Sequence, residues 1–240
     1  MKLAIMQPYF FPYIGYFSLM QEADQFIIFD TVQFQRKSWM VRNCILNLNG
    51  GSSYIHLPVK KAPLSSCIKD IYVDDEIDWK EKLFNQLQIY KKAPYFTETI
   101  KVLEKALNSN YKTLTDINKN LLVEISNYLN LKCKISVFSE MELDIEEVYT
   151  ADEWALNISK KLNATEYINA PGGVCFFDRE KYENNNIKLK FIKNKLNPYK
   201  QFHLDFVPGL SIIDVIMFNS INKIHEMLVN YEEIFQETIS

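Results

Sequence analysis

The chain has 240 residues, of which 48% are hydrophobic and 24% are charged, which suits one large domain with a sizeable core. Its net charge of −3 argues against a dedicated nucleic-acid binder, which would carry a basic domain. The cysteines and histidines are scattered without a CxxC pair, so neither a disulfide framework nor a metal site is expected. There is no apolar run long enough for a membrane span and no signal-peptide cleavage site, which favours a cytoplasmic protein.

The first thirty residues predict a strand, a loop, a helix and a second strand. Residues 3–6 are a short apolar strand, residues 14–22 have a helical pattern, and residues 25–30 are a buried strand that ends in Asp30. Such a βαβ-type start implies two parallel strands with a right-handed crossover. The loop between the first strand and the helix is rich in proline and aromatic residues, whereas ordinary loops are polar. It is either a plug for the core or the wall of a binding pocket, because α/β proteins bind ligands where such strands end.

The middle of the chain predicts a hairpin followed by helices. Residues 41–47 and 53–59 are expected strands joined across Asn49-Gly50-Gly51, a strong turn signal. A further strand is expected at residues 68–73. Helical periodicity then predicts three helices, which form a mainly helical segment at about residues 77–130. These helices are expected at residues 79–90, 95–108 and 115–129.

The last part of the chain returns to an alternating α/β pattern. Strands are expected at residues 135–138, 166–169, 174–177 and 187–192. Helices are expected at residues 151–162, after Pro208-Gly209, and as amphipathic turns at 222–230 and 231–238. The prediction is therefore a single α/β domain over residues 1–240, with a mostly parallel sheet, a hairpin insertion and a helical layer.

Several polar residues are candidates for chemistry. Asp30 ends a strand, where α/β enzymes place acids beside a ligand, although it can equally cap the loop that follows. A set of cations lies close together in the sequence and can bind carboxylate or phosphate, although such residues are usually solvated surface. These cations are Arg36, Lys37, Arg42, Lys60 and Lys61. Trp39 and Asn43 lie among them, which favours a ligand site.

A second polar and aromatic run covers residues 197–205. His203 in this run is a candidate acid or base, although a lone histidine is more often structural. Asp214 follows Ser211 at the spacing of a capping box, which offers a helix-cap explanation for this acid. Cys175 has no partner that would activate it, and the chain contains no P-loop, G-x-G-x-x-G or G-x-S-x-G motif.

The segment Tyr13-Ile-Gly15-Tyr16 occupies the place of the His-x-Gly-His motif of HIGH-superfamily nucleotidyltransferases, at the start of the first helix. This comparison suggests a related HIGH-like fold. Tyrosine cannot replace imidazole in proton transfer near pH 7, so nucleotidyl transfer of the ordinary kind is not expected.

The opening run Gln7-Pro-Tyr-Phe-Phe-Pro-Tyr-Ile-Gly-Tyr-Phe17 resembles the signature of the WbqC-like protein family. The resemblance continues in consistent order over about nine-tenths of the chain. Its further blocks are residues 29–34, 39–43, 57–61, 90–96, Asn118, 199–201 and 210–214. The segment Tyr199-Lys-Gln201 departs from the Tyr-Pro-Gln form of relatives, which leaves the shape of this loop open.

This resemblance implies a bacterial protein of O-antigen or surface-polysaccharide biosynthesis that transfers glycine or another aminoacyl group to a nucleotide-linked amino sugar. Asp30 or His203 would serve as the general base, and no cofactor is evident; the activated acyl donor and the oligomeric state stay open. The expected substrate-binding residues are Gln7, Tyr9, Phe10, Tyr13, Tyr16, Lys37, Trp39, Arg42, Asn43, Lys60, Tyr199, Gln201 and Asp214. The alternative is a non-catalytic module that binds a sugar nucleotide or a pathway partner. A glycosyltransferase would usually have a D-x-D metal motif and ranks last, because the acidic run Asp74-Asp75-Glu76 is expected to end a strand in a solvated turn.

Overall fold

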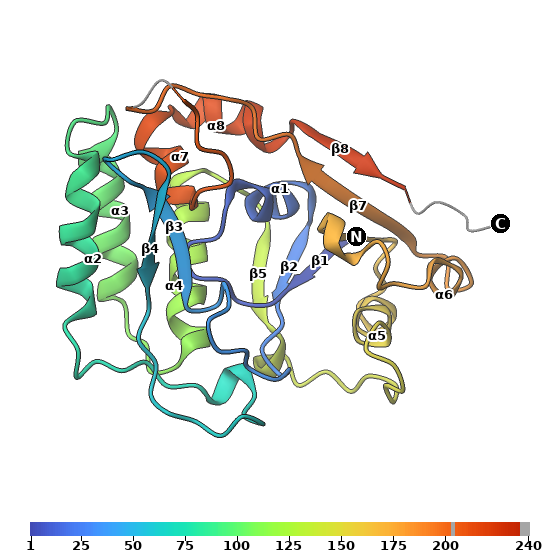
Figure 1. Ribbon diagram of the computed structural model, residues 1–240. Helices are drawn as coiled ribbons and strands as arrows, with labels where there is room; N and C mark the ends of the chain where they lie inside the picture. Colours follow the sequence, from blue (N-terminus) through green and yellow to red (C-terminus); the bar gives the residue numbers. More distant parts are fainter. Residues whose placement is uncertain (203–204, 236–240) are drawn as a thin grey trace.

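A computed structural model describes residues 1–202 and 205–235 of the chain and contains an α/β fold built on a mostly parallel sheet (Figure 1). The strand order is β5-β2-β1-β6-β7-β8; the first five strands pair in parallel and β8 pairs antiparallel to β7. The strands of this sheet are β1 (Lys2–Met6), β2 (Gln25–Ile28), β5 (Lys134–Val137), β6 (Glu166–Asn169), β7 (Lys188–Asn194) and β8 (Tyr231–Ile234). The predicted α/β class and mostly parallel sheet are confirmed.

Both faces of the sheet are covered, as the alternation of side chains along the strands requires. In β1, Ala4 packs in the apolar cluster that contains α1, α4, α7 and α8, whereas Leu3 and Ile5 pack in the cluster of α5 and α6. The same division occurs in β2, where Phe26 faces the first cluster and Ile27 the second. The helices are α1 (Ile14–Glu22), α2 (Trp79–Leu87), α3 (Phe96–Asn108), α4 (Leu114–Tyr128), α5 (Glu153–Lys161), α6 (Arg179–Glu183), α7 (Ile212–Phe218) and α8 (Ile221–Leu228).

The predicted hairpin is present as β3 (Arg42–Leu46) and β4 (Ser52–His56), paired antiparallel in a separate two-stranded sheet. It lies between the central sheet and the helices α2 and α3 (Figure 1). Ile45 and Ile55 are buried on its inner face and join the same apolar cluster as the sheet and α2 to α4. The hairpin and the helical layer therefore extend the core of the sheet on one side.

Three predicted elements are wrong. Residues 68–73 form a short 3₁₀ turn (Ile68–Asp70) and isolated bridges instead of a strand, because Ile68 and Ile71 are buried three residues apart while Lys69 and Asp70 are exposed. Tyr231–Ile234 is strand β8 rather than a helical turn, because the free edge of β7 offers backbone partners that outweigh a weak helical pattern. Residues 174–177 are likewise a turn after the 3₁₀ segment Pro171–Gly173.

Candidate functional site: an aromatic cavity at the switch point of the sheet

The position of the candidate site follows from the strand order. From β1 the chain crosses to β2 on one side of the sheet, whereas from β6 it crosses to β7 on the other side. The two crossovers diverge between β1 and β6, and loops at the carboxyl ends of such neighbouring strands leave a crevice where open α/β sheets bind ligands. Here Met6 ends β1 and Ala170 follows β6, and both line a cavity of about 450 Å³.

The walls of this cavity are aromatic and uncharged. The aromatic and polar side chains at the cavity are Tyr9, Tyr13, Tyr16, Trp39 and Asn43. Leu196 and Gly209, from the long segment between β7 and α7, close it on a further side. Among the described residues that line the cavity there is no carboxylate, imidazole or cation. The site is therefore suited to ring-shaped, uncharged parts of a ligand.

The loop after β1 is held by donors from distant parts of the chain. Pro8 and Pro12 lack an N–H group, so this loop has more carbonyl acceptors than donors of its own. Asn43 Nδ2 donates to the carbonyls of Phe10 (3.0 Å) and Phe11 (2.7 Å), and Ser211 Oγ donates to that of Phe11 (2.9 Å). These bonds support Phe11 in the left-handed conformation (φ 45°), which is unfavourable for a bulky residue.

Two further bonds complete this support. Asn118 Nδ2, fully buried on α4, donates to the carbonyls of Pro8 (3.3 Å) and Met40 (3.0 Å). The amide of Ile212, at the start of α7, donates to the carbonyl of Pro12 (2.9 Å). The loop is thereby fixed to β3, α4 and α7 at once, which gives the cavity a preformed wall.

The tyrosines of the cavity divide into one that is engaged and two that have free hydroxyls. Tyr16 donates from its hydroxyl to the carbonyl of Gln7 (2.7 Å) and is fully buried. The hydroxyls of Tyr9 and Tyr13 have no hydrogen-bond partner among the described residues. Burial raises the pKa of Tyr9 and of Tyr13, so both phenols stay protonated and can donate to a ligand.

Gly15 is needed for the position of Tyr13. A Cβ at residue 15 would lie 2.4 Å from the ring of Tyr13, so the ring rests directly on the glycine backbone. Both residues are at the N-terminus of α1, which has no side-chain cap and no acidic residue in its first turn. The amide of Tyr16 donates to the carbonyl of Tyr13 (3.0 Å), and Tyr13 and Gly15 both line the cavity. The positive end of the helix dipole therefore lies beside the cavity.

Asp30 lies outside the cavity. It is 1% exposed, and its carboxylate accepts from the backbone amide (3.1 Å) and the hydroxyl (2.7 Å) of Ser139. Burial raises the pKa of Asp30, and the bonds from Ser139 partly oppose this rise. Its carbonyl accepts from Lys69, so Asp30 joins the ends of β2 and β5 to the turn at Ile68–Asp70. His203, the other predicted base, lies outside the described residues.

The predicted cations are not brought together. Lys37 is exposed in the loop before Trp39, and Lys60 forms an exposed ion pair with Glu76 (3.6 Å). Arg42 is half-buried on the outer face of the hairpin, where its guanidinium lies 4.8 Å from the centre of the Tyr54 ring. Neighbouring strand residues point to opposite faces, so Asn43 reaches the cavity and Arg42 does not.

Asp214, Tyr199 and Gln201 form a cluster inside the protein. Asp214 is fully buried and accepts from Tyr90 Oη (2.7 Å), Gln201 Nε2 (2.7 Å) and the hydroxyl of Tyr199. Desolvation raises the pKa of Asp214, and these three donors oppose the rise. Ser211 caps α7 by accepting from the amide of Ile213, so no capping box forms with Asp214. The cluster anchors the segment that supplies Leu196 and Gly209 to the cavity.

The remaining predicted residues have structural surroundings. Gln7 uses its carbonyl to hold Tyr16, and Phe10 is fully buried against Phe11 and Trp79. Gly209, Ala170 and Leu196 also line the cavity. In the sequence, Pro208-Gly209 was visible only as a turn signal, and nothing indicated that Ala170 or Leu196 would line a cavity. Asn118 was visible as part of a family block but without its role in holding the loop.

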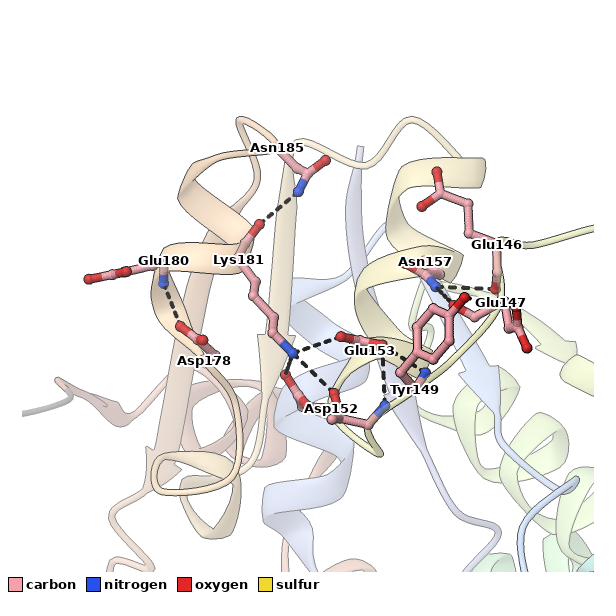
Figure 2. A network of polar contacts seen from close by, with 11 residues as sticks. Glu146, Glu147, Tyr149, Asp152, Glu153, Asn157, Asp178, Glu180, Lys181 and Asn185 are labelled. Carbon is pink, nitrogen blue, oxygen red and sulfur yellow. Dashed lines mark hydrogen bonds and ion pairs between the residues drawn. The ribbon is translucent and has the colours of Figure 1, made fainter.

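A second polar cluster lies away from the cavity, around Lys181 (Figure 2). Lys181 Nζ contacts Glu153 (2.8 Å), Asp152 (3.1 Å) and the hydroxyl of Thr150 (3.0 Å). These contacts join α6 to the start of α5. No group of His, Cys, Asp and Glu side chains in residues 1–202 and 205–235 is arranged to hold a metal ion. The helices of the same residues include none with the length and apolar character of a bilayer span.

Fold and site together define an α/β protein with an aromatic cavity at the switch point of a doubly wound sheet. The chain belongs to the WbqC-like protein family, whose model matches residues 7–226. It is 29% identical over 222 residues to a Mycobacterium tuberculosis (strain ATCC 25618 / H37Rv) protein described as "Uncharacterized protein Rv1507c", covering 91% of this chain and 93% of that protein. No solved structure matches the chain significantly, so the HIGH-like assignment stays a prediction.

Proposed function

We propose that this protein acts in bacterial surface-polysaccharide biosynthesis and binds a nucleotide-linked amino sugar in the cavity between β1 and β6. Its membership of a family that is associated with polysaccharide biosynthesis supports the proposed role in that pathway. The observation that carries the binding proposal is the pairing of aromatic walls with the uncapped N-terminus of α1. All four cysteines are free thiols, which agrees with the cytoplasm as the place of action.

The two features suit the two parts of such a ligand. Tyr9, Tyr13 and Trp39 offer flat faces for the base or the sugar ring, and Trp39 is 46% exposed at the cavity. The N-terminus of α1, where Gly15 lines the cavity, offers the positive end of the helix dipole to the diphosphate. No cation of the described lining is needed for this arrangement, because backbone amides at a helix N-terminus bind phosphate by themselves.

The reaction we propose for this site is transfer of glycine or another aminoacyl group to the sugar amine. The amine nitrogen attacks the carbonyl carbon of an activated acyl donor, an amide bond forms, and the donor's leaving group departs with the bonding electrons. The free hydroxyls of Tyr9 and Tyr13 are suitable donors to the oxyanion of the tetrahedral intermediate. The proton of the amine needs an acceptor, and Asp30 and His203 remain the proposed candidates. In the structure the carboxylate of Asp30 accepts hydrogen bonds from the amide and the hydroxyl of Ser139.

A non-catalytic binding module is the second candidate, because none of the described lining residues is a carboxylate or a histidine. Such a module would use the same aromatic walls and the same helix N-terminus without transferring a group. The two candidates share the binding step, so binding and turnover are tested separately.

The binding test is calorimetric titration with UDP-glucosamine, UDP and free glucosamine. Tyr9→Phe, which removes only a hydroxyl, should weaken binding about 5- to 10-fold, and Tyr9→Ala should weaken it further by removing the ring. Tyr149→Phe is the matched control, because Tyr149 is 78% exposed and contacts Glu147 away from the cavity. Equal affinity of all variants would overturn the assignment of the cavity.

The transfer test is mass spectrometry of UDP-glucosamine incubated with the protein and activated glycine donors, namely glycyl thioester, glycyl adenylate and glycyl-tRNA. A glycyl mass increment that depends on the protein supports the transferase. Binding without any increment supports the module instead. Asp30→Asn then tests the base: turnover that survives this substitution excludes Asp30 from that role.

A further inference from the structure

The outer face of the hairpin carries Arg42 and His56, and the strands β3 and β4 contain no carboxylate. Arg42 of β3 lies directly opposite His56 of β4 in the strand register, and Tyr54 lies beside them on the same face. Helix α2 packs against β4, where Gln86 donates to the carbonyl of Tyr54, and it places the positive charge of Lys82 near His56. These residues, Arg42, Tyr54, His56 and Lys82, are called the hairpin cation site below.

Arg42 is one of the cations that have no acidic partner within 4 Å among the described residues. Lys60, Lys105 and Lys119 each pair with a glutamate within 4 Å. The guanidinium of Arg42 instead rests on the Tyr54 ring, and its Nε–H is buried without an acceptor in the described part of the chain. A buried donor without an acceptor is unfavourable, particularly on a charged group. The positive charge of Arg42 is therefore not neutralised by any acidic side chain of the described residues.

The surroundings of His56 agree with this observation on Arg42. The pKa of His56 is lowered by its partial burial and by the positive charges of Arg42 and Lys82. The groups that face it are Tyr54 on its own strand, Arg42 on β3 and Lys82 on α2, and none of them is negative at neutral pH. Like charges directly opposite in a β-sheet destabilise the pair, and a bound anion would reverse this effect.

We propose that the hairpin cation site binds a phosphate group, as orthophosphate or as part of a phosphate ester. The guanidinium of Arg42 supplies planar donors that suit phosphate oxygens, and Lys82 supplies a point charge. The stacking on Tyr54 holds the guanidinium in place. This site is distinct from the switch-point cavity, because Asn43 lines the cavity and the adjacent Arg42 points to the opposite face of β3.

The experiment is an NMR titration of the His56 imidazole, recorded against pH with and without phosphate. Bound phosphate should raise the pKa of His56 by at least half a unit, saturably, because the protonated ring gains a negative neighbour. Orthophosphate, glucose 1-phosphate and UDP are used as separate probes, and chloride at equal ionic strength is the reference. An unchanged pKa with every probe overturns the proposal.

Variants locate the effect. Arg42→Gln and Lys82→Gln should each weaken phosphate binding at least tenfold, whereas Lys60→Gln, an exposed cation of a different segment that is already paired with Glu76, should leave it unchanged. Lys82 is an exposed helix residue, so Lys82→Gln provides the test even where Arg42→Gln unfolds the hairpin. Equal weakening by Lys60→Gln and Lys82→Gln would show unspecific attraction to surface charge and overturn the site.

Discussion

Buried amide side chains determine the shape of the loop after β1. Asn43 and Asn118 are 5% and 0% exposed, and each donates two hydrogen bonds from a single Nδ2 to backbone carbonyls. Loops rich in proline and aromatic side chains lack donors of their own, so these amides replace the partners that secondary structure would otherwise provide. Their role is to hold the wall of the cavity, and the ligand would meet the aromatic side chains instead.

Asn43→Ala should lower the free energy of unfolding by about 3 kcal/mol, because it leaves the buried carbonyl of Phe10 without its donor and weakens the support of Phe11. Asn120→Ala is the matched control, since it removes the same chemical group from a bond to the carbonyl of Asn110 at the surface. We expect a loss below about 1 kcal/mol there. Urea unfolding measures both, and equal losses would contradict the proposed role of Asn43.

Gly15→Ala should displace the ring of Tyr13 from the cavity, because the new Cβ would lie 2.4 Å from ring atoms that can swing away. The expected result is a loss of about 1–3 kcal/mol in stability and faster nitration of Tyr13 by tetranitromethane, mapped by mass spectrometry. Gly172→Ala is the control, as a Cβ there meets nothing within 4 Å. Unchanged nitration of Tyr13 in the Gly15 variant would contradict the close packing.

The sequence indicated which kinds of residue line the cavity better than it indicated where each side chain points. Of the residues predicted to bind substrate, Tyr9, Tyr13, Tyr16, Trp39 and Asn43 line one cavity. Arg42, Lys37 and Lys60 do not, because the direction of a side chain depends on strand parity and loop conformation, which a pattern of residue types does not contain. The burial of Asp214 depends on tyrosines far apart in the sequence and was invisible for the same reason.

At the scale of elements, ion pairs compensate for a short helix. Helix α6 has only five residues, too few for a stable helix by itself, and Lys181 on it contacts Glu153 and Asp152 at the start of α5 (Figure 2). Hydrogen bonds lower the pKa of Glu153 to about 2. The largest contribution comes from Lys181, and smaller ones come from the amides of Tyr149 and Thr150. The contact therefore links α5 and α6 in a pH-dependent way.

Lys181→Met should destabilise the protein at pH 6 and have a smaller effect at pH 3. The folded-state pKa of Glu153 lies below the unfolded value, so its contribution is present above pH 4.5 and is lost as the pH falls toward 2. Urea unfolding of both proteins between pH 6 and pH 3 measures the difference. Lys188→Met, which removes an exposed lysine 3.8 Å from Glu166, is the control. A difference between wild type and Lys181→Met that does not change with pH would contradict the assignment.

Elements with strong local signals were predicted well, and those that depend on a neighbour were not. The hairpin was visible because Gly50 and Gly51 occupy positions with φ of 93° and 71°, which favour glycine. Strand β8 was missed because Tyr231–Ile234 becomes a strand only through the edge of β7. Helix α6 was not predicted for a similar reason, since its support comes from α5.

At the scale of the whole molecule, we propose that residues 1–240 unfold as one unit. The apolar cluster runs without interruption from Ala4 and Phe26 of the sheet to Leu83 of α2 and Leu103 of α3. The hydrogen bonds of the loop after β1 connect the same regions. Contacts of this kind favour a cooperative transition.

The protein labelled with 5-fluorotryptophan tests this proposal, because each tryptophan reports on a different region of one molecule. Trp79 lies on α2 in the helical layer, and Trp154 lies on α5 across the sheet, against Phe29 and Phe138. The ¹⁹F signals of Trp79 and Trp154 should have the same urea midpoint. A separate, earlier transition at Trp79 would show that the helical layer at about residues 77–130 is an independent domain.

The supports of the loop after β1 also set an order for assembly during synthesis. Its partners lie 32 residues away at Asn43, 110 residues away at Asn118 and 200 residues away at Ser211. The aromatic loop leaves the ribosome before all three partners, and the last of its anchors follows 200 residues later. Until then Tyr9, Phe10 and Phe11 are apolar surface on a nascent chain, the kind of surface that chaperones bind. A chain truncated before Ser211 would therefore lack this loop's final anchor.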